Sequence, residues 1–273
     1  MYKRMNEQLQ KEGAMALVTG ASSGIGLAYA RELARRGYDL LLVSNEQERI
    51  GTVAEELATA FGVKTIPLCM DLARSEAARE LYDYCEREKL QIGILVNNAG
   101  IFFFDDLTEV APERIETMLL LHIRTVTLLC RYFGAAMKRR RAGYILNMSS
   151  LSAWTPAPGI SVYAASKSYI RKFSQMLRYE LHQYGVGVTT VCPGAIATGL
   201  YNLSDYYQRL ALRLGVMMKP ERLARKGLRA MFARRDYILP GAVNRFFVLA
   251  LYLLPVQLIY YIKEHTKLYR YGR

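Results

Sequence analysis

The sequence is poor in the residues that build disulfide frameworks and metal centres. Among its 273 residues are three histidines and four cysteines, Cys69, Cys85, Cys130 and Cys192. The cysteines lie far apart without a CxxC pair, which argues against a structural zinc site and against a disulfide framework. This usage is typical of a reducing compartment, and we expect a cytoplasmic protein without a bound metal.

Long apolar runs, linkers and repeats are also scarce. The run at 246–262 has 17 residues and is broken by Pro255, whereas about 20 apolar residues are needed to cross a bilayer. The charged start, MYKRMNEQLQKEGAM, does not resemble a secretory signal. With no internal repeat and no Pro/Gly/Ser-rich linker, the sequence favours one folded domain over 1–241, followed by an extension over 242–273.

Acidic residues are missing chiefly from the last part of the chain. The net charge is +13, but residues 1–212 carry 24 basic and 21 acidic residues, whereas residues 213–273 carry 13 and 3. Such a basic segment attracts the phosphates of a cofactor, an anionic lipid or a nucleic acid. We do not expect nucleic-acid binding, because no recognised nucleic-acid module is present.

What the first 200 residues do contain is an alternation of short apolar runs and longer amphipathic stretches. Continuous apolar strands separated by helices indicate a parallel sheet buried on both faces. The pattern predicts a Rossmann-like, doubly wound α/β fold, with its ligand site beyond the carboxyl ends of the strands. We expect strands at 14–19, 38–43, 63–69, 92–96, 143–148 and 186–192, and helices near 25–36, 47–61, 75–88, 112–138, 161–184 and 220–235.

The first predicted strand runs into a glycine-rich turn, Thr19-Gly-Ala-Ser-Ser-Gly-Ile-Gly26, and a helix follows at once. Glycines permit a tight turn, and a helix start presents unpaired N–H groups to a phosphate. A second motif, Tyr163-Ala-Ala-Ser-Lys167, places a phenol and an ammonium one helical turn apart. The ammonium favours the phenolate, which suits the tyrosine to general acid/base catalysis.

Further motifs follow the other predicted strands: Asn97-Asn98-Ala99-Gly100, Ser149-Ser150 and Pro193-Gly194 with Thr198 beyond. Together with the glycine-rich turn and the Tyr163–Lys167 pair, their order and spacing over 13–240 closely resemble the short-chain dehydrogenase/reductase family. The resemblance implies hydride transfer between a nicotinamide cofactor and a carbonyl or alcohol carbon. It also implies a homodimer or homotetramer.

The resemblance further implies a role for each matching residue. Tyr163 exchanges the proton with the substrate oxygen, Ser150 holds that oxygen, and Lys167 binds the nicotinamide ribose and lowers the tyrosine pKa. The cofactor contacts implied in this way fall on Gly20, Ser22, Ser23, Gly24, Ile25 and Gly26, on Ser44 and Asn45, on Asp71 and Leu72, on Asn98, Ala99 and Gly100, on Tyr163 and Lys167, and on Pro193, Gly194, Ile196 and Thr198.

One position departs from the family pattern, and one segment bears on the choice between NAD(H) and NADP(H). His122 stands where the family has an asparagine whose backbone helps to hold a relay water; either only that backbone matters, or the His122 imidazole joins the relay as a catalytic residue. After the second strand, Ser44-Asn45-Glu46 lacks the aspartate common in NAD users, and Arg49 follows. Although Glu46 argues the other way, we expect NADP(H) rather than NAD(H).

Two segments leave alternatives open. Residues 199–218 and Phe102-Phe103-Phe104 either line a pocket for an apolar carbonyl or alcohol substrate or pack on the core or a sister subunit. The basic helix at 220–235 and the apolar run after it form either a peripheral membrane contact on the cytoplasmic face or an internal or oligomer contact. We expect an NADPH-dependent reductase of a 3-oxoacyl, keto-sphingoid or steroid ketone. The alternative is a non-catalytic nucleotide-binding regulator or scaffold, and a third class is an isomerase or dehydratase.

Overall fold

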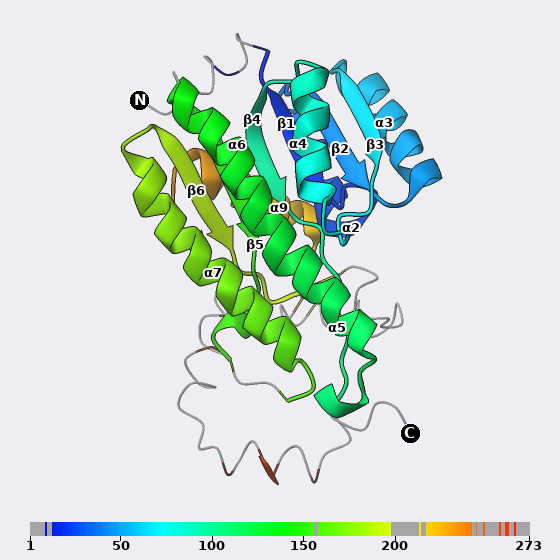
Figure 1. Ribbon diagram of the computed structural model, residues 1–273, viewed down its shortest axis with the longest axis vertical. Helices are drawn as coiled ribbons and strands as arrows, with labels where there is room; N and C mark the ends of the chain where they lie inside the picture. Colours follow the sequence, from blue (N-terminus) through cyan, green and yellow to red (C-terminus); the bar gives the residue numbers. More distant parts are fainter. Residues whose placement is uncertain are drawn as a thin grey trace.

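Seven parallel strands form the centre of the protein in the computed structural model (Figure 1). The structure describes residues 13–155, 158–197 and 217–241, with the single residues 9, 213, 244, 248, 257, 260, 261 and 265. The strand order is β3-β2-β1-β4-β5-β6-β9, so the chain starts in the middle of the sheet and winds outward in both directions. The strands are β1 Met15–Thr19, β2 Leu40–Ser44, β3 Thr65–Cys69, β4 Ile92–Asn97, β5 Gly143–Met148, β6 Val186–Val191 and β9 Tyr237–Ile238.

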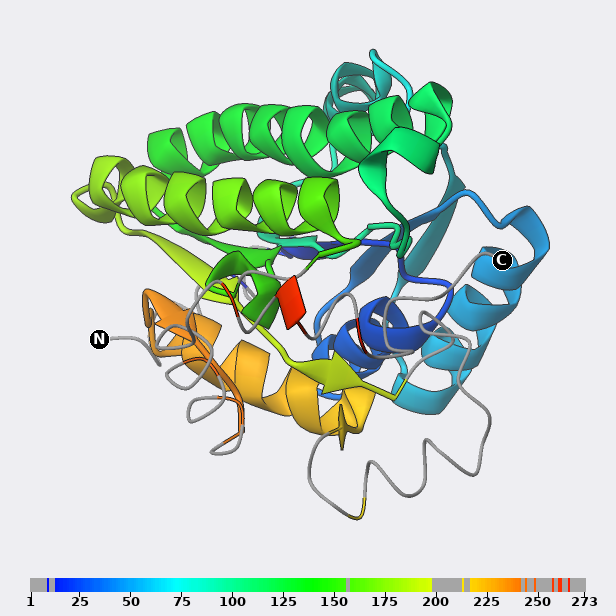
Figure 2. The ribbon, with the colours of Figure 1, turned by 90° about the horizontal axis from the view of Figure 1, so that it is seen from below.

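Helices cover both faces of the sheet (Figure 2). On one face lie α2 Gly24–Ala34, α3 Gln47–Phe61 and α9 Pro220–Phe232, and on the other lie α4 Ala77–Arg87, α6 Val126–Arg140 and α7 Ser161–His182. Alternate residues of one strand therefore enter different cores: Val18 of β1 joins the cluster under α2 and α9, and Leu17 joins the cluster under α4 and α6. The predicted doubly wound α/β fold is confirmed.

The long helix expected at 112–138 contains a change of winding. The chain is helical from α5 (Pro112–Leu119) into α6, but Leu120–Thr125 between them form a π-helical turn. Such wider turns are rare and concentrate at functional sites. Here the turn carries His122, the position at which the sequence departs from the family pattern.

The basic helix predicted at 220–235 is observed as α9, but it is part of the folded body. Its apolar residues Leu223, Leu228 and Met231 are fully buried in the core cluster beneath α2. Only the basic side of this helix is left exposed, and the expected membrane contact of the C-terminal segment stays a prediction. The strands β7 (Ala195–Ile196), β8 (Met217–Met218) and β9 have two residues each, too short for a periodic pattern to predict.

The other part of the expected anchor, the run at 246–262, lies almost wholly outside the described residues, as does most of the segment 199–218. Both interpretations of these segments stay predictions. Within the described ranges, no helix is both long enough and apolar enough to cross a bilayer.

Candidate active site

A cavity of about 650 Å³ opens beyond the carboxyl ends of the parallel strands. Its volume lies within the usual range of small-molecule and cofactor sites. Most of the residues singled out from the sequence line it: Gly20, Ser22, Ser23, Gly24, Ile25, Ser44, Asn45, Asp71, Leu72, Asn98, Ala99, Gly100, Ser150, Tyr163, Lys167, Pro193, Gly194 and Ile196. Gly26 and His122 are not among the lining residues, and Thr198 lies outside the described residues.

Close backbone packing shapes the start of the cavity. Gly20 has a φ of +64°, and a Cβ there would lie 2.9 Å from the Cα of Ala99. A Cβ on Gly26 would overlap the carbonyl oxygen of Gly20. Gly26 therefore brings the helix start against the turn and does not itself contact the cavity, because only hydrogen fits between the two backbones.

The loop after β4 is tied to the same turn by hydrogen bonds. The Thr19 hydroxyl accepts from the backbone N–H groups of Asn98 and Ala99, at 2.9 and 3.0 Å. The Asn98 side-chain amide donates back to the carbonyl oxygens of Thr19 and Gly20, at 3.0 and 3.3 Å. We did not single out Thr19 as a site residue, although its position directly before the first glycine is a signal that could have done so.

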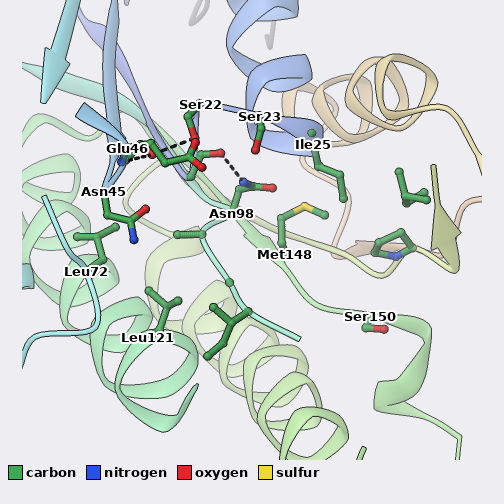
Figure 3. Close-up of a pocket in the computed structure, with 18 of the residues that line it drawn as sticks. Ser22, Ser23, Ile25, Asn45, Glu46, Leu72, Asn98, Leu121, Met148 and Ser150 are labelled. Atoms are coloured by element: carbon green, nitrogen blue, oxygen red, sulfur yellow. Dashed lines mark hydrogen bonds between the residues drawn. The ribbon is translucent and has the colours of Figure 1, made fainter. Parts of the chain in front are cut away.

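The first turn of α2 points its N–H groups toward the cavity. Its N-cap residue, Ser23, makes no side-chain capping hydrogen bond, and Gly24 and Ile25 line the wall. Figure 3 shows Ser22 and Ser23 at this helix start. A helix start left open in this way is suited to an anionic group, because its N–H groups and dipole both favour negative charge.

The end of β2 provides the polar rim on that side. The Ser44 hydroxyl is buried and engaged: it donates to Ser22 Oγ at 2.9 Å and accepts from the Glu46 N–H at 3.2 Å. Asn45 and Glu46 are exposed and lie far from Ser150 across the cavity in Figure 3. Arg49 is fixed over the turn, because its Nε donates to the Ser22 carbonyl at 3.0 Å.

Ser150, Tyr163 and Lys167 gather at the opposite end. Lys167 Nζ lies 5.5 Å from the centre of the Tyr163 ring and donates to the Met148 carbonyl at 3.2 Å. Ser149 Oγ donates to the Lys167 carbonyl at 2.7 Å, which ties α7 to the end of β5. Burial lowers the pKa of Lys167 to about 8, because the charged form is poorly solvated there.

Ser150 keeps its hydroxyl proton available. Its Oγ accepts a hydrogen bond from the Ser152 N–H at 3.1 Å, within the turn Leu151–Ala153. A hydroxyl has one donor and two acceptor positions, so this bond leaves the donor free for an oxygen in the cavity.

His122 lies behind Tyr163 and is fully buried. Its Nε2 accepts from the Ile101 N–H at 3.1 Å, so the proton of a neutral ring is on Nδ1, which is 2.9 Å from Ser166 Oγ. Ser166 donates in turn to the Tyr163 carbonyl at 2.8 Å. Burial and the Lys167 charge hold the pKa of His122 well below its usual range. The geometry favours the alternative in which the His122 ring does not titrate.

Apolar side chains surround Tyr163 on its other sides. Phe103 is buried with Val110, Met118 and Tyr163, and the Phe102 ring stands edge-on to Tyr163 at 5.0 Å. These two phenylalanines therefore pack around Tyr163 and are not among the residues that line the cavity. Sequence reasoning missed five lining residues, which are Met70, Ile101, Leu121, Met148 and Ala197. Most of them adjoin a residue that we singled out, which is the signal that could have found them.

Comparison with known proteins identifies the family to which the chain belongs. Residues 14–205 match the model of the short chain dehydrogenase family. A very-long-chain 3-oxoacyl-CoA reductase of Anas platyrhynchos is 37% identical over 70% of this chain and 62% of its own length. The inactive hydroxysteroid dehydrogenase-like protein 1 of Homo sapiens is 32% identical over 74% and 61%. The chain thus covers about three fifths of these relatives' lengths.

A solved structure extends the similarity to three dimensions. The short-chain dehydrogenase of Sphingobium yanoikuyae in complex with NADPH is 30% identical, with a TM-score of 0.76 over 87% of this chain and 92% of that one. The family match covers well over half of the chain, including strands β1 to β6 and the residues that line the cavity. The chain therefore belongs to the short-chain dehydrogenase family.

Proposed function

We propose that the protein is an NADPH-dependent reductase of a ketone on an apolar substrate. The observation that carries the proposal is the placement of Tyr163, Lys167 and Ser150 together at one end of a cavity that has an open helix start near its other end. A nicotinamide cofactor supplies the hydride in such a reaction. The chain's own residues bind the cofactor and the substrate and transfer the proton.

Proton transfer falls to Tyr163. In the reducing direction its hydroxyl donates a proton to the carbonyl oxygen of the substrate, while Ser150 Oγ donates a hydrogen bond to the same oxygen. The Lys167 ammonium stabilises the phenolate that remains, since a nearby positive charge lowers the pKa of a phenol. The low exposure of Tyr163 and Lys167, 9% and 6%, keeps water from weakening this electrostatic effect.

The residues present fit a dinucleotide phosphate. The Gly20–Gly26 turn leaves room only for backbone, and the N–H groups at the start of α2 are oriented for a pyrophosphate. The exposed Asn45 and Arg49 at the rim suit a 2′-phosphate better than a bare ribose, because the rim has no aspartate at the end of β2. Asp71 and Leu72 line the wall where an adenine would lie.

An apolar substrate is supported by the surroundings of Tyr163 and by the relatives. Ile101, which packs against the cluster that holds the Tyr163 ring, lines the cavity together with Met148 and Ile196. The names of two relatives refer to a 3-oxoacyl-CoA reductase and to a 17-beta-hydroxysteroid dehydrogenase. Both substrate classes carry a ketone on a large hydrocarbon body, and we propose the same class here.

The direct test follows NADPH oxidation with 3-oxoacyl thioesters, keto-sphingoid bases and ketosteroids. We expect turnover with at least one class, and a loss of at least about 100-fold in kcat for Tyr163→Phe, since general acid catalysis contributes about 10²- to 10⁴-fold. Tyr169→Phe, on the exposed side of the same helix, is the matched control and should keep its rate. Absence of turnover on every class would reject the proposal.

Cofactor choice is tested at Arg49. A charge-assisted bond to a phosphate is worth about 1.5–3 kcal/mol, so Arg49→Ala should lower kcat/KM for NADPH by about 10- to 150-fold and leave the value for NADH nearly unchanged. Arg79→Ala, on the exposed surface of α4, is the control. Equal losses with both cofactors, or a wild-type preference for NADH, would contradict the assignment.

A non-catalytic regulator with the same fold is the second candidate, and it is favoured by one finding. Several relatives are named inactive hydroxysteroid dehydrogenase-like proteins. In this chain Ser150, Tyr163 and Lys167 are all present and brought together in the cavity, which supports the enzyme. Tight NADPH binding without turnover would favour the regulator.

A further inference from the structure

The outer face of α9 is a stripe of positive charge. Arg222, Arg225, Lys226 and Arg229 follow one another at intervals of three, one and three residues, which places them on one side of the helix. The three arginines are exposed and Lys226 is half-buried. We call these four residues the α9 stripe. The one acid of the helix, Glu221, is in its first turn.

Within the part of the chain that the structure describes, the charges of the stripe have no acidic partner. Among the described residues, none of the four forms an ion pair. On the neighbouring helix, Glu32 is already paired with Arg35 and Arg36, while Arg31 is exposed. Unpaired like charges held side by side repel one another, so an anionic surface outside the protein would be attracted strongly.

The orientation of the stripe is fixed by the buried side of α9. Leu223, Leu228 and Met231 are fully buried, and Gly227 lies directly against the Tyr29 ring of α2. The helix therefore cannot turn its apolar side outward. Only the cationic side of α9 can therefore contact a partner. This indicates an electrostatic contact and not insertion into a hydrocarbon layer.

We propose that the α9 stripe is a docking surface for the anionic head groups of a lipid membrane, with the helix lying along the bilayer surface. The sequence favours lipid over nucleic acid, because the apolar run 246–262, flanked by Arg245 and Lys263, follows soon after the helix. The docking does not depend on the enzymatic activity proposed above.

Docking in this way would bring the cavity close to the bilayer. One residue separates β8 from the start of α9. β8 pairs with β7, and Ile196 of β7 lines the cavity. Figure 2 shows β7 beside the start of α9. A membrane held by the stripe would therefore lie beside one wall of the cavity, from which an apolar ketone could enter.

The test is co-sedimentation of the full chain with phosphatidylcholine vesicles that contain or lack phosphatidylserine. Each basic residue near an anionic leaflet strengthens binding about fivefold, so Arg222→Glu/Arg225→Glu/Arg229→Glu should weaken binding to the anionic vesicles by at least about 100-fold. Raising the salt from about 0.1 to 1 M shortens the screening length from about 10 to 3 Å and should release the wild type.

The matched control makes the same charge change on the opposite layer, as Arg131→Glu/Arg139→Glu/Lys172→Glu at exposed positions of α6 and α7. This variant should bind nearly as the wild type does, and unchanged unfolding midpoints show that both variants fold. Equal loss in the two variants would overturn the proposal, because the effect would then follow net charge. Salt-insensitive binding, or binding of duplex DNA in preference to vesicles, would also overturn it.

Discussion

His122 is an example of a residue whose hydrogen-bonding groups are all used in the folded protein. Its two ring nitrogens hold the Ile101 N–H and the Ser166 hydroxyl, and through Ser166 the ring supports the Tyr163 carbonyl. A protonated ring would set an N–H against the N–H of Ile101. The neutral ring thus connects the loop after β4 to the helix that carries Tyr163.

This arrangement predicts the behaviour of His122→Asn. The unfolded chain takes up a proton on His122 below pH about 6.5, whereas the folded chain does not, so the wild type loses stability as the pH falls below that value. The variant should be less stable near neutral pH, by about 1–3 kcal/mol for the lost buried hydrogen bonds, and its stability should fall less on acidification.

Measuring unfolding midpoints and kcat against pH distinguishes a structural role of His122 from a role in the proton relay. Ser166→Ala breaks the same chain of hydrogen bonds and is the companion variant; it should keep the acid sensitivity. Because burial holds the pKa of His122 well below its usual range, the kcat profile of His122→Asn should keep its shape near neutral pH. Disappearance of a kcat inflection in that variant alone would instead place the imidazole in the proton relay.

The sequence was enough to predict that Tyr163, Lys167 and Ser150 lie in one cavity, but not which residues support them. These three can be recognised because their order and spacing resemble a known family pattern, and their catalytic roles stay a proposal. Thr19 and Ser166 act through hydrogen bonds to the backbone of distant segments, and many residue types can do so. Their roles become visible only when the fold brings the segments together.

At the scale of elements, helix packing distinguishes two glycines that look alike in sequence. Gly51 in α3 has open space where a Cβ would be, whereas a Cβ on Gly227 in α9 would overlap the Tyr29 hydroxyl. Both are interior helix positions, where alanine is favoured over glycine by about 0.5–1 kcal/mol. Only at Gly227 is glycine needed, because it allows α9 to pack closely against α2.

Alanine at each glycine should therefore have opposite effects. Gly51→Ala should raise the free energy of unfolding by about 0.5–1 kcal/mol, while Gly227→Ala should lower it by about 1 kcal/mol or more, since overpacking costs about 1–3 kcal/mol. Denaturant unfolding of the two variants beside the wild type measures this. A gain in stability at Gly227 would show that α9 can move away from α2 at no cost.

Elements with strong periodicity were predictable and those without it were not. The six longer strands and the main helices lie within a few residues of the expected ranges, because apolar runs and amphipathic stretches are local signals. The π-helical turn at Leu120–Thr125 has no such signal, since six residues are too few to establish a different period within a long helical stretch. The sequence also does not show which way the charged side of α9 faces; the packing of the helix on the core shows it.

For the whole molecule, the sequence shows the imbalance of charge but not its geometry. The basic excess belongs to the last 61 residues, and part of it is now placed on one face of the α2–α9 layer. On the opposite layer, α4 pairs charges within the helix, as in the ion pair of Arg79 with Asp83, whereas α6 carries basic residues and no acid. Both layers therefore have exposed basic residues, and what distinguishes α9 is its place in the chain, shortly before the apolar run 246–262.

The edges of that sheet have a consequence for solubility. One edge strand, β3, carries Pro67 at its centre, and the other, β9, is only two residues long. A proline removes a backbone donor, and a very short strand offers almost no template, so neither edge readily accepts a strand from another molecule. We expect crowded copies of this protein to resist joining into β-rich aggregates, because growth of the sheet is blocked at both ends.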